Sequence, residues 1–235
     1  MLGFGKNDKD AIADTKTALE AAKGPRADDG VLGNAGTRVV ERLLDAGIDG
    51  RGPFDSAAKI AADALRKHDR ADGAVDAIIK EHTMLAAGGG FVTSMGGFIT
   101  MPVSLPANVL EFYLVATRMV AAIAKARGYD INQPEIRSAI LLTLVGADAD
   151  DLLKKAGVVA TGRLSNLAAQ RLPGPVLMVV NKAVGFRLLS TAGKGVLSRF
   201  GKGVPVVGGF VGAGLDVYLL RRIADHARQE FPATR

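Results

Sequence analysis

Few side chains in this 235-residue sequence have the types and spacing that catalysis or metal binding requires. Ser56 and Lys59 have the Ser-x-x-Lys spacing of a serine/lysine nucleophile pair. They occur early in an Ala-rich segment, where a serine is favoured as a helix N-cap, so we interpret Ser56 as a cap. The histidines His68, His82 and His226 are never three or four residues apart, and the chain has no cysteine. The sequence therefore predicts no metal site and no bound cofactor.

Two glycine-rich stretches also fail as nucleotide-binding loops. Residues 195–202 contain Gly-x5-Gly-Lys, which lacks both the spacing and the Ser/Thr of a Walker loop. The glycines at 209–214 lack the spacing of a dinucleotide fingerprint and follow no predicted strand. We interpret these glycines as positions of close helix packing or tight turning.

Glu81, Glu111 and Arg118 form a predicted polar cluster in an otherwise apolar region. Glu111 and Arg118 are seven residues apart, which places them on about the same face of a helix. One interpretation is a structural ion pair, because a buried charge usually needs a partner. The other is an enzyme site that opens to a pocket. We favour the ion pair, and we predict no catalytic residue.

The segment 83–110 contains no ionisable side chain. It reads TMLAAGGGFVTSMGGFITMPVSLPANVL, a length that would suit a bilayer span. Its glycine clusters and two prolines break a straight helix, so we predict an apolar hairpin of two short helical pieces that turns at 101–105. The hairpin would either pack inside the fold, which we favour, or enter a membrane shallowly. A second glycine-rich segment, GVPVVGGFVGAGL, occupies 203–215.

The charge of the chain is divided unevenly along the sequence. Residues 1–151 contain 21 acidic and 17 basic residues, whereas residues 152–215 contain nine basic residues and no acidic one. Such a one-sign block is typical of a positive surface that meets an anionic partner. The alternative is that these residues are the solvated faces of helices. Because the block lacks interleaved aromatic residues and any helix-turn-helix or RNA-binding motif, nucleic acid is disfavoured as the partner.

The pattern of apolar residues, caps and breakers predicts an all-α protein without a sheet. It would be a compact multi-helix bundle with glycine- and proline-rich apolar helical hairpins. Helices are expected over 8–23, 35–46, 53–68, 72 onward, 106–127, 134–144, 148–172 and 176–189, and from the 203–215 segment to 231. A linker is expected at 25–36, with breaks at 47–52 and 190–203. We divide the chain into an N-terminal appendage, 1–52, and a helical domain, 53–235.

The stretch GGGFVTSMGGFITMPVSLPANVLEFYLVATRMVAAIAKARGYD resembles the signature of the EcsC protein family. The resemblance covers roughly residues 54–231. Its residues are Gly96-Gly97, Pro102, Pro106, Arg118-Met119, Ile123-Ala124, Gly128-Tyr129-Asp130, Arg187-Leu188, Lys202, Pro205 and Gly208-Gly209. It implies a helical bacterial protein whose family is named from association with an ABC-transporter operon. It implies no reaction and no catalytic residue. The sequence 216–219, DVYL, also echoes EFYL at 111–114, a weak sign of internal duplication.

The leading hypothesis is a non-catalytic peripheral membrane or lipid-binding protein. Apolar side chains of the two glycine-rich segments would meet lipid, and the basic block would meet anionic head groups. The predicted contact residues are Phe91, Phe98, Met101, Lys182, Arg187, Lys194, Arg199, Lys202 and Phe210. The alternative is an interaction module that docks on a transporter or on a secretion or assembly machinery. Because the N-terminus has no apolar signal region, we expect a cytoplasmic protein, peripheral on the inner face of the cell membrane.

Overall fold

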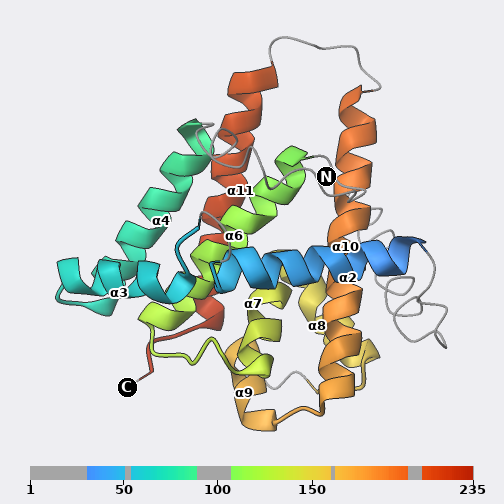
Figure 1. Ribbon diagram of the computed structural model, residues 1–235, viewed down its shortest axis with the longest axis horizontal. Helices are drawn as coiled ribbons and strands as arrows, with labels where there is room; N and C mark the ends of the chain where they lie inside the picture. Colours follow the sequence, from blue (N-terminus) through green and yellow to red (C-terminus); the bar gives the residue numbers. More distant parts are fainter. Residues whose placement is uncertain (1–30, 51–53, 89–106, 160–161, 201–207, 235) are drawn as a thin grey trace, which may run out of the picture.

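The computed structural model describes residues 31–50, 54–88, 107–159, 162–200 and 208–234, and every element among them is helical (Figure 1). The first elements are α2 (Val31–Arg42), the π-helix η2 (Leu43–Ile48), α3 (Ala57–Lys67), α4 (Ala71–Gly88) and α6 (Ala107–Ala126). The remaining elements are α7 (Pro134–Val145), η3 (Gly146–Asp148), α8 (Ala149–Lys155), η4 (Leu164–Asn166), α9 (Leu167–Gln170), α10 (Gly174–Phe200) and α11 (Gly208–Glu230). The predicted all-α class is confirmed. The expected helix 8–23 and most of the expected hairpin lie outside the described residues.

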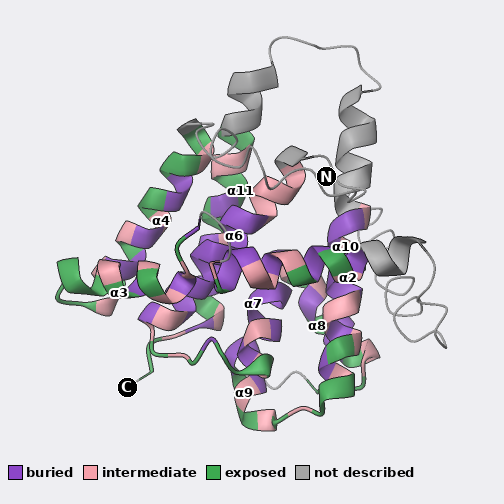
Figure 2. Ribbon diagram, viewed as in Figure 1, coloured by how far each residue is buried: buried purple, intermediate pink, exposed green. Residues whose placement is uncertain are grey.

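Helix α6 is the central element of the bundle. It packs against α3, α4, α7, α11 and η2, and every residue from Leu114 to Ala124 is buried (Figure 2). The alanines of this stretch carry short side chains, so neighbouring helices approach on several sides. The helix begins after Pro106 and is followed by Gly128, whose φ of 95° favours glycine, close to the predicted bounds of 106–127.

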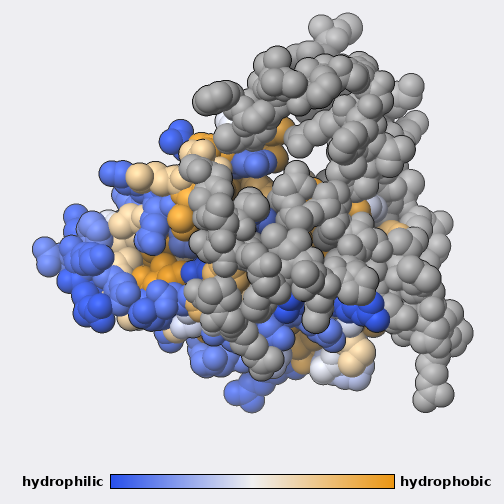
Figure 3. Space-filling view, turned by 45° about the horizontal axis from the view of Figure 1, so that its top comes forward, coloured by the Kyte–Doolittle hydropathy of each residue, from blue (hydrophilic) through white to orange (hydrophobic). Residues whose placement is uncertain are grey.

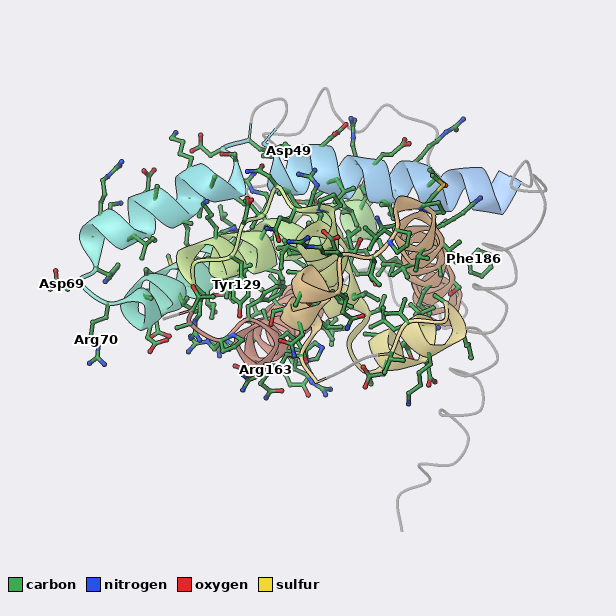
Figure 4. The ribbon with its side chains drawn as sticks, turned by 90° about the horizontal axis from the view of Figure 1, so that it is seen from below. Asp49, Asp69, Arg70, Tyr129, Arg163 and Phe186 are labelled. Atoms are coloured by element: carbon green, nitrogen blue, oxygen red, sulfur yellow. The ribbon has the colours of Figure 1, made fainter. Side chains whose placement is uncertain are left out.

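Helix α2 crosses α10 at a contact between two glycines. A Cβ on Gly185 would lie 2.3 Å from the carbonyl oxygen of Gly36, and one on Gly36 would lie 3.0 Å from the backbone nitrogen of Phe186. Figure 4 shows Phe186 on α10 where α2 passes over that helix. The two backbones are therefore in direct contact, which only glycine at these positions permits.

Two boundaries near the N-terminus were predicted wrongly, because each contains a glycine that packs against another helix. The expected linker at 25–36 is helical from Val31 onward, because the glycine at 36 serves helix contact and does not break the helix. The break expected from residue 47 is delayed, since η2 continues through Ile48 and Gly47 packs against the Thr117 side chain. The chain turns at Gly50, whose φ is 74°.

Two boundaries in the C-terminal half were also predicted wrongly. The single helix expected over 148–172 is divided into α8, η4 and α9, because Gly157 and Gly162 take positive φ values of 80° and 83°. The break expected over 190–203 is helical as far as Phe200, because α10 tolerates its glycines at 193 and 195 and no proline lies between 176 and 204.

Arginine–carboxylate pairs connect elements that are distant in sequence. Each has an arginine nitrogen within hydrogen-bonding distance of an aspartate oxygen, and Arg137 binds Asp49 with two nitrogens. The pairs are Asp49–Arg137 at 2.7 Å, Asp72–Arg127 at 2.6 Å, Asp148–Arg187 at 2.6 Å, and Asp76–Arg228. They fix η2 to α7, α4 to α6 and α11, and η3 to α10.

The N-terminal elements contribute to the same core as the rest of the bundle. Val39 of α2, and Leu43 and Ile48 of η2, are buried and belong to the cluster that includes the centre of α6. These residues lie before the domain boundary predicted between 52 and 53, which stays a prediction.

We expect Gly185→Ala to lower the free energy of unfolding by about 1–3 kcal/mol, because the new Cβ would overlap the α2 backbone. The matched control is Gly214→Ala in α11, where a Cβ meets nothing within 4 Å, so helix propensity should raise stability by about 0.5–1 kcal/mol. Urea unfolding followed by circular dichroism measures both. Equal effects of the two substitutions would contradict the backbone contact.

Candidate functional site

Four helix ends lie at one end of the molecule. The last turn of α4, the first turns of α6 and α11, and the last turns of α10 are all in the upper part of Figure 1. In the sequence, the glycine-rich segment 83–110 follows α4 into α6, and the segment 203–215 follows α10 into α11. Helix ends separated by more than 90 residues, such as the start of α6 and the end of α10, therefore lie at the same end of the bundle.

Exposed apolar side chains are concentrated at this end. We define the apolar end as Met84 and Leu85 of α4 with Leu215, Tyr218 and Leu219 of α11. The exposed fraction is 63% for Met84 and 56% for Tyr218. Among the described residues, these five account for most of the large exposed hydrophobic side chains, the others being Leu65, Val159 and Met178. Figure 3 turns this end forward and shows apolar patches among the hydrophilic surface.

The predicted contact residues of the glycine-rich segments are only partly described. Phe91, Phe98 and Met101 lie outside the described residues, and so does Lys202. Lys194 and Arg199 belong to the last turns of α10, and Phe210 belongs to the first turn of α11. These helix turns lie at the same end of the bundle as the apolar end. The exposed residues Met84, Leu85 and Tyr218 were not among the predicted contact residues, and the signal for them in the sequence was their position beside the glycine clusters.

The described members of the basic block are distributed along the bundle. Helix α10 alone has 27 residues, which corresponds to a length of about 40 Å. Arg187, halfway along it, donates from Nε to Asp148 at 2.6 Å, and its side chain is 12% exposed. Lys182 is half-buried and also has a partner. Arg163 precedes Leu164, whose backbone nitrogen donates to Glu230, the last residue of α11, at the end of that helix opposite to the apolar end. The position of each base along α10 therefore decides whether it can act at the apolar end.

The three residues of the predicted polar cluster lie in two different places. Arg118 is buried, and its guanidinium lies 4.9 Å from the centre of the Phe54 ring. Burial lowers the pKa of Arg118, whereas the carboxylates of Asp55 and Glu81 raise it. Glu111 is two turns nearer the apolar end. Burial and the carboxylate of Asp216 on α11 raise the pKa of Glu111. The structure thus brings Glu81 to Arg118, and it brings Glu111 to Asp216.

His82 is a buried, neutral histidine beside this arginine. Its Nδ1 lies 2.8 Å from the carbonyl oxygen of Ile78, so Nδ1 donates the proton and Nε2 is left as an acceptor. Nε2 finds no hydrogen-bond partner among the described residues. Burial and the Arg118 charge lower the pKa of His82 to about 4, although the hydrogen bond to the Ile78 carbonyl raises that pKa. The imidazole is therefore uncharged at neutral pH.

Ser56 is an N-cap, as its position predicted. Its Oγ accepts a hydrogen bond from the backbone nitrogen of Lys59 at 3.2 Å. The Lys59 ammonium binds Asp55 at 2.7 Å. The pair therefore caps and stabilises the start of α3. Among the described residues, no three His, Asp or Glu side chains are placed to share a metal ion. No helix in the described part of the chain is both long enough and apolar enough to cross a bilayer.

Burial of neutral His82 makes stability depend on pH. The unfolded chain takes up a proton at pH about 6.5, whereas the folded chain resists it down to pH about 4. Because the unfolded state binds more protons in this interval, stability should fall as pH decreases through it, by on the order of 3 kcal/mol. His82→Gln should remove this contribution, and His68→Gln, at an exposed site, should leave it unchanged. Urea unfolding at several pH values measures the difference, and parallel curves for wild type and His82→Gln would contradict it.

The family model for the EcsC protein family matches residues 61–233. Neither a curated protein nor a solved structure matches the chain. The match covers most of the sequence and confirms the resemblance predicted from the residues. The chain therefore belongs to the EcsC protein family.

Proposed function

We propose that this EcsC-family protein is a non-catalytic peripheral membrane protein that contacts lipid with its apolar end. The observation that supports this function best is that the described helix ends flanking both glycine-rich segments lie at the end where Met84, Tyr218 and their neighbours are exposed. In a bacterial cell, the corresponding location is the inner face of the cytoplasmic membrane.

The chemistry of the exposed side chains supports this proposal. Methionine and leucine lose their contact with water on entering lipid, and full burial of one such side chain is worth about 1.5–3 kcal/mol. Tyrosine has an apolar ring and a polar hydroxyl, which suits the boundary between acyl chains and head groups. Tyr218 has this character and is more than half exposed. The apolar end thus combines residues for the acyl region with one for its boundary.

Positive charge near the apolar end would add attraction for anionic lipid. Lys194 and Arg199 lie in the part of α10 that runs toward this end. Each basic residue near an anionic surface is worth about 1 kcal/mol. Arg187 contributes little to this attraction because it is bound to Asp148. The membrane contact would therefore combine apolar burial with a smaller, salt-dependent electrostatic part.

Co-flotation with liposomes tests the proposal directly. We expect the purified protein to float with vesicles that contain phosphatidylglycerol, and to bind less at high salt, because salt screens the basic residues. Residual binding at high salt would report the apolar contact. No binding to either anionic or neutral vesicles would overturn the lipid function. Co-purification of one stoichiometric protein without lipid would instead support docking on a transporter or assembly partner.

Two exposed methionines provide a matched pair of variants for locating the contact. Met84 is at the apolar end and Met178 is near the start of α10 at the opposite end, and their exposed fractions are 63% and 69%. We expect Met84→Glu to weaken vesicle binding at least about tenfold, because a carboxylate opposes entry into lipid. Met178→Glu should bind as wild type does, and thermal unfolding should confirm that both variants fold. Equal loss in both variants would contradict a contact at the apolar end.

A further inference from the structure

Each of the two apolar stretches at this end contains one carboxylic acid. Between Thr83 and Thr117, Glu111 is the only acidic or basic residue. Between Gly203 and Leu220, Asp216 is the only one. Both acids follow a leucine and precede, by two residues, a tyrosine. The two stretches thus place an acid in the same local sequence context.

The ion pairs of α4 place these two acids at the same level of the bundle. Helix α4 runs antiparallel to both α6 and α11 (Figure 1). Asp72 of α4 pairs with Arg127 at the end of α6. Counting the same number of residues from each partner toward the apolar end, at an equal rise per residue, places Glu111 level with Gly88. The pair Asp76–Arg228 sets the register with α11, and Asp216 also lies level with Gly88. Since α6 and α11 pack together, the two acids are neighbours at the apolar end.

In the described parts of α4 and α6, few charged groups lie close to this pair along the sequence. On α4, no ionisable residue lies between Thr83 and Gly88. Arg118, the next charge along α6, is about 10 Å farther into the bundle, where Asp55 and Glu81 act on it. The elements packed against α6 and α11 carry further titratable groups, and so do these two helices themselves: Asp45, Lys59, Asp63, Arg66, Lys67, Asp72, Asp76, Lys80, Glu81, His82, Tyr113, Lys125, Glu135, Arg137, Tyr218, Arg221, Arg222, Asp225, His226, Arg228 and Glu230. Helix α10 carries Lys182, Arg187, Lys194 and Arg199.

The surroundings of Glu111 agree with this placement. Burial raises its pKa, and the carboxylate of Asp216 raises it further. Both side chains are half-buried, and Asp216 is flanked on α11 by the exposed residues Leu215, Tyr218 and Leu219. Two carboxylates that are close together resist ionising at the same time, so one of them takes up a proton more readily than an isolated acid does.

We propose that Glu111 and Asp216 form a proton-controlled switch for the membrane contact, which weakens the contact of the apolar end with lipid when both are ionised and strengthens it when a proton is shared between them. This inference rests on the function proposed above. The physical reason is that a carboxylate carried toward the acyl region loses its hydration, whereas a protonated pair carries less charge and costs less to transfer. The proton comes from solvent and is bound by a carboxylate oxygen, with no other chemical change.

The test compares vesicle binding at pH about 7.5 and about 5, with circular dichroism to confirm folding at each pH. Vesicles of phosphatidylcholine alone and with phosphatidylglycerol are both used, because histidine protonation would raise binding only to the anionic ones. We expect the wild-type partition coefficient to rise about tenfold on acidification with both vesicle types. The double variant Glu111→Gln/Asp216→Asn should bind at both pH values as strongly as acidified wild type. The matched control Asp225→Asn, an exposed acid lower on α11, should keep the wild-type response.

The outcomes separate this switch from the proposed function. Wild type that binds vesicles equally at both pH values, or a double variant that keeps the full response, would overturn the switch and leave the membrane function intact. Wild type that binds no vesicle at either pH would overturn both. A lipid-free measurement tests the carboxyl pair itself, since Asp216→Asn should lower the pKa of Glu111 in an NMR titration. An unchanged pKa would show that the two acids are not coupled.

Discussion

The enclosure of α6 is the constraint on which the rest of the structure depends. A helix that is buried on every side cannot use a polar face, so its stretch from Leu114 to Ala124 is almost entirely apolar and rich in alanine. Short side chains allow the neighbouring helices to approach closely. The crossing of α2 over α10 at Gly36 and Gly185 is close for the same reason. The stretch has two polar residues: Thr117 donates its hydroxyl proton to the carbonyl oxygen of Tyr113, and Arg118 has the face of the Phe54 ring and two nearby carboxylates.

The helices with clear chemical boundaries could be predicted from sequence. Pro106 and Gly128 bracket α6, and Pro134 opens α7, because proline and glycine act on the backbone at their own positions. Prediction was wrong where a glycine has a tertiary role. Gly36 looks like a linker residue but packs against another backbone, and Gly157 looks like a helix residue but takes a left-handed conformation. Local sequence does not distinguish these cases.

The candidate site could be predicted in parts but not as an assembly. The two glycine-rich segments stand out because they lack charge, yet the packing of the helices that flank them depends on pairs such as Asp76–Arg228, whose members are 152 residues apart. Nothing local encodes that register. The similar sequences around Glu111 and Asp216 were the one available signal that the two segments are related in space. Conversely, Arg187 was grouped with the lipid-facing bases by its charge alone, although its partner is Asp148.

The position of α2 has a practical consequence for how this protein can be divided. The family match begins at residue 61, but Val39, Leu43 and Ile48 fill part of the core that α6 and α10 share. A fragment trimmed to the matched region would lose this cover. Core side chains beside Gly185 would become exposed to solvent, and large exposed apolar surfaces bind vesicles non-specifically and aggregate. Non-specific adsorption of this exposed core to vesicles would look like lipid binding. The chain upstream of the match must therefore be kept in any protein used to measure membrane binding.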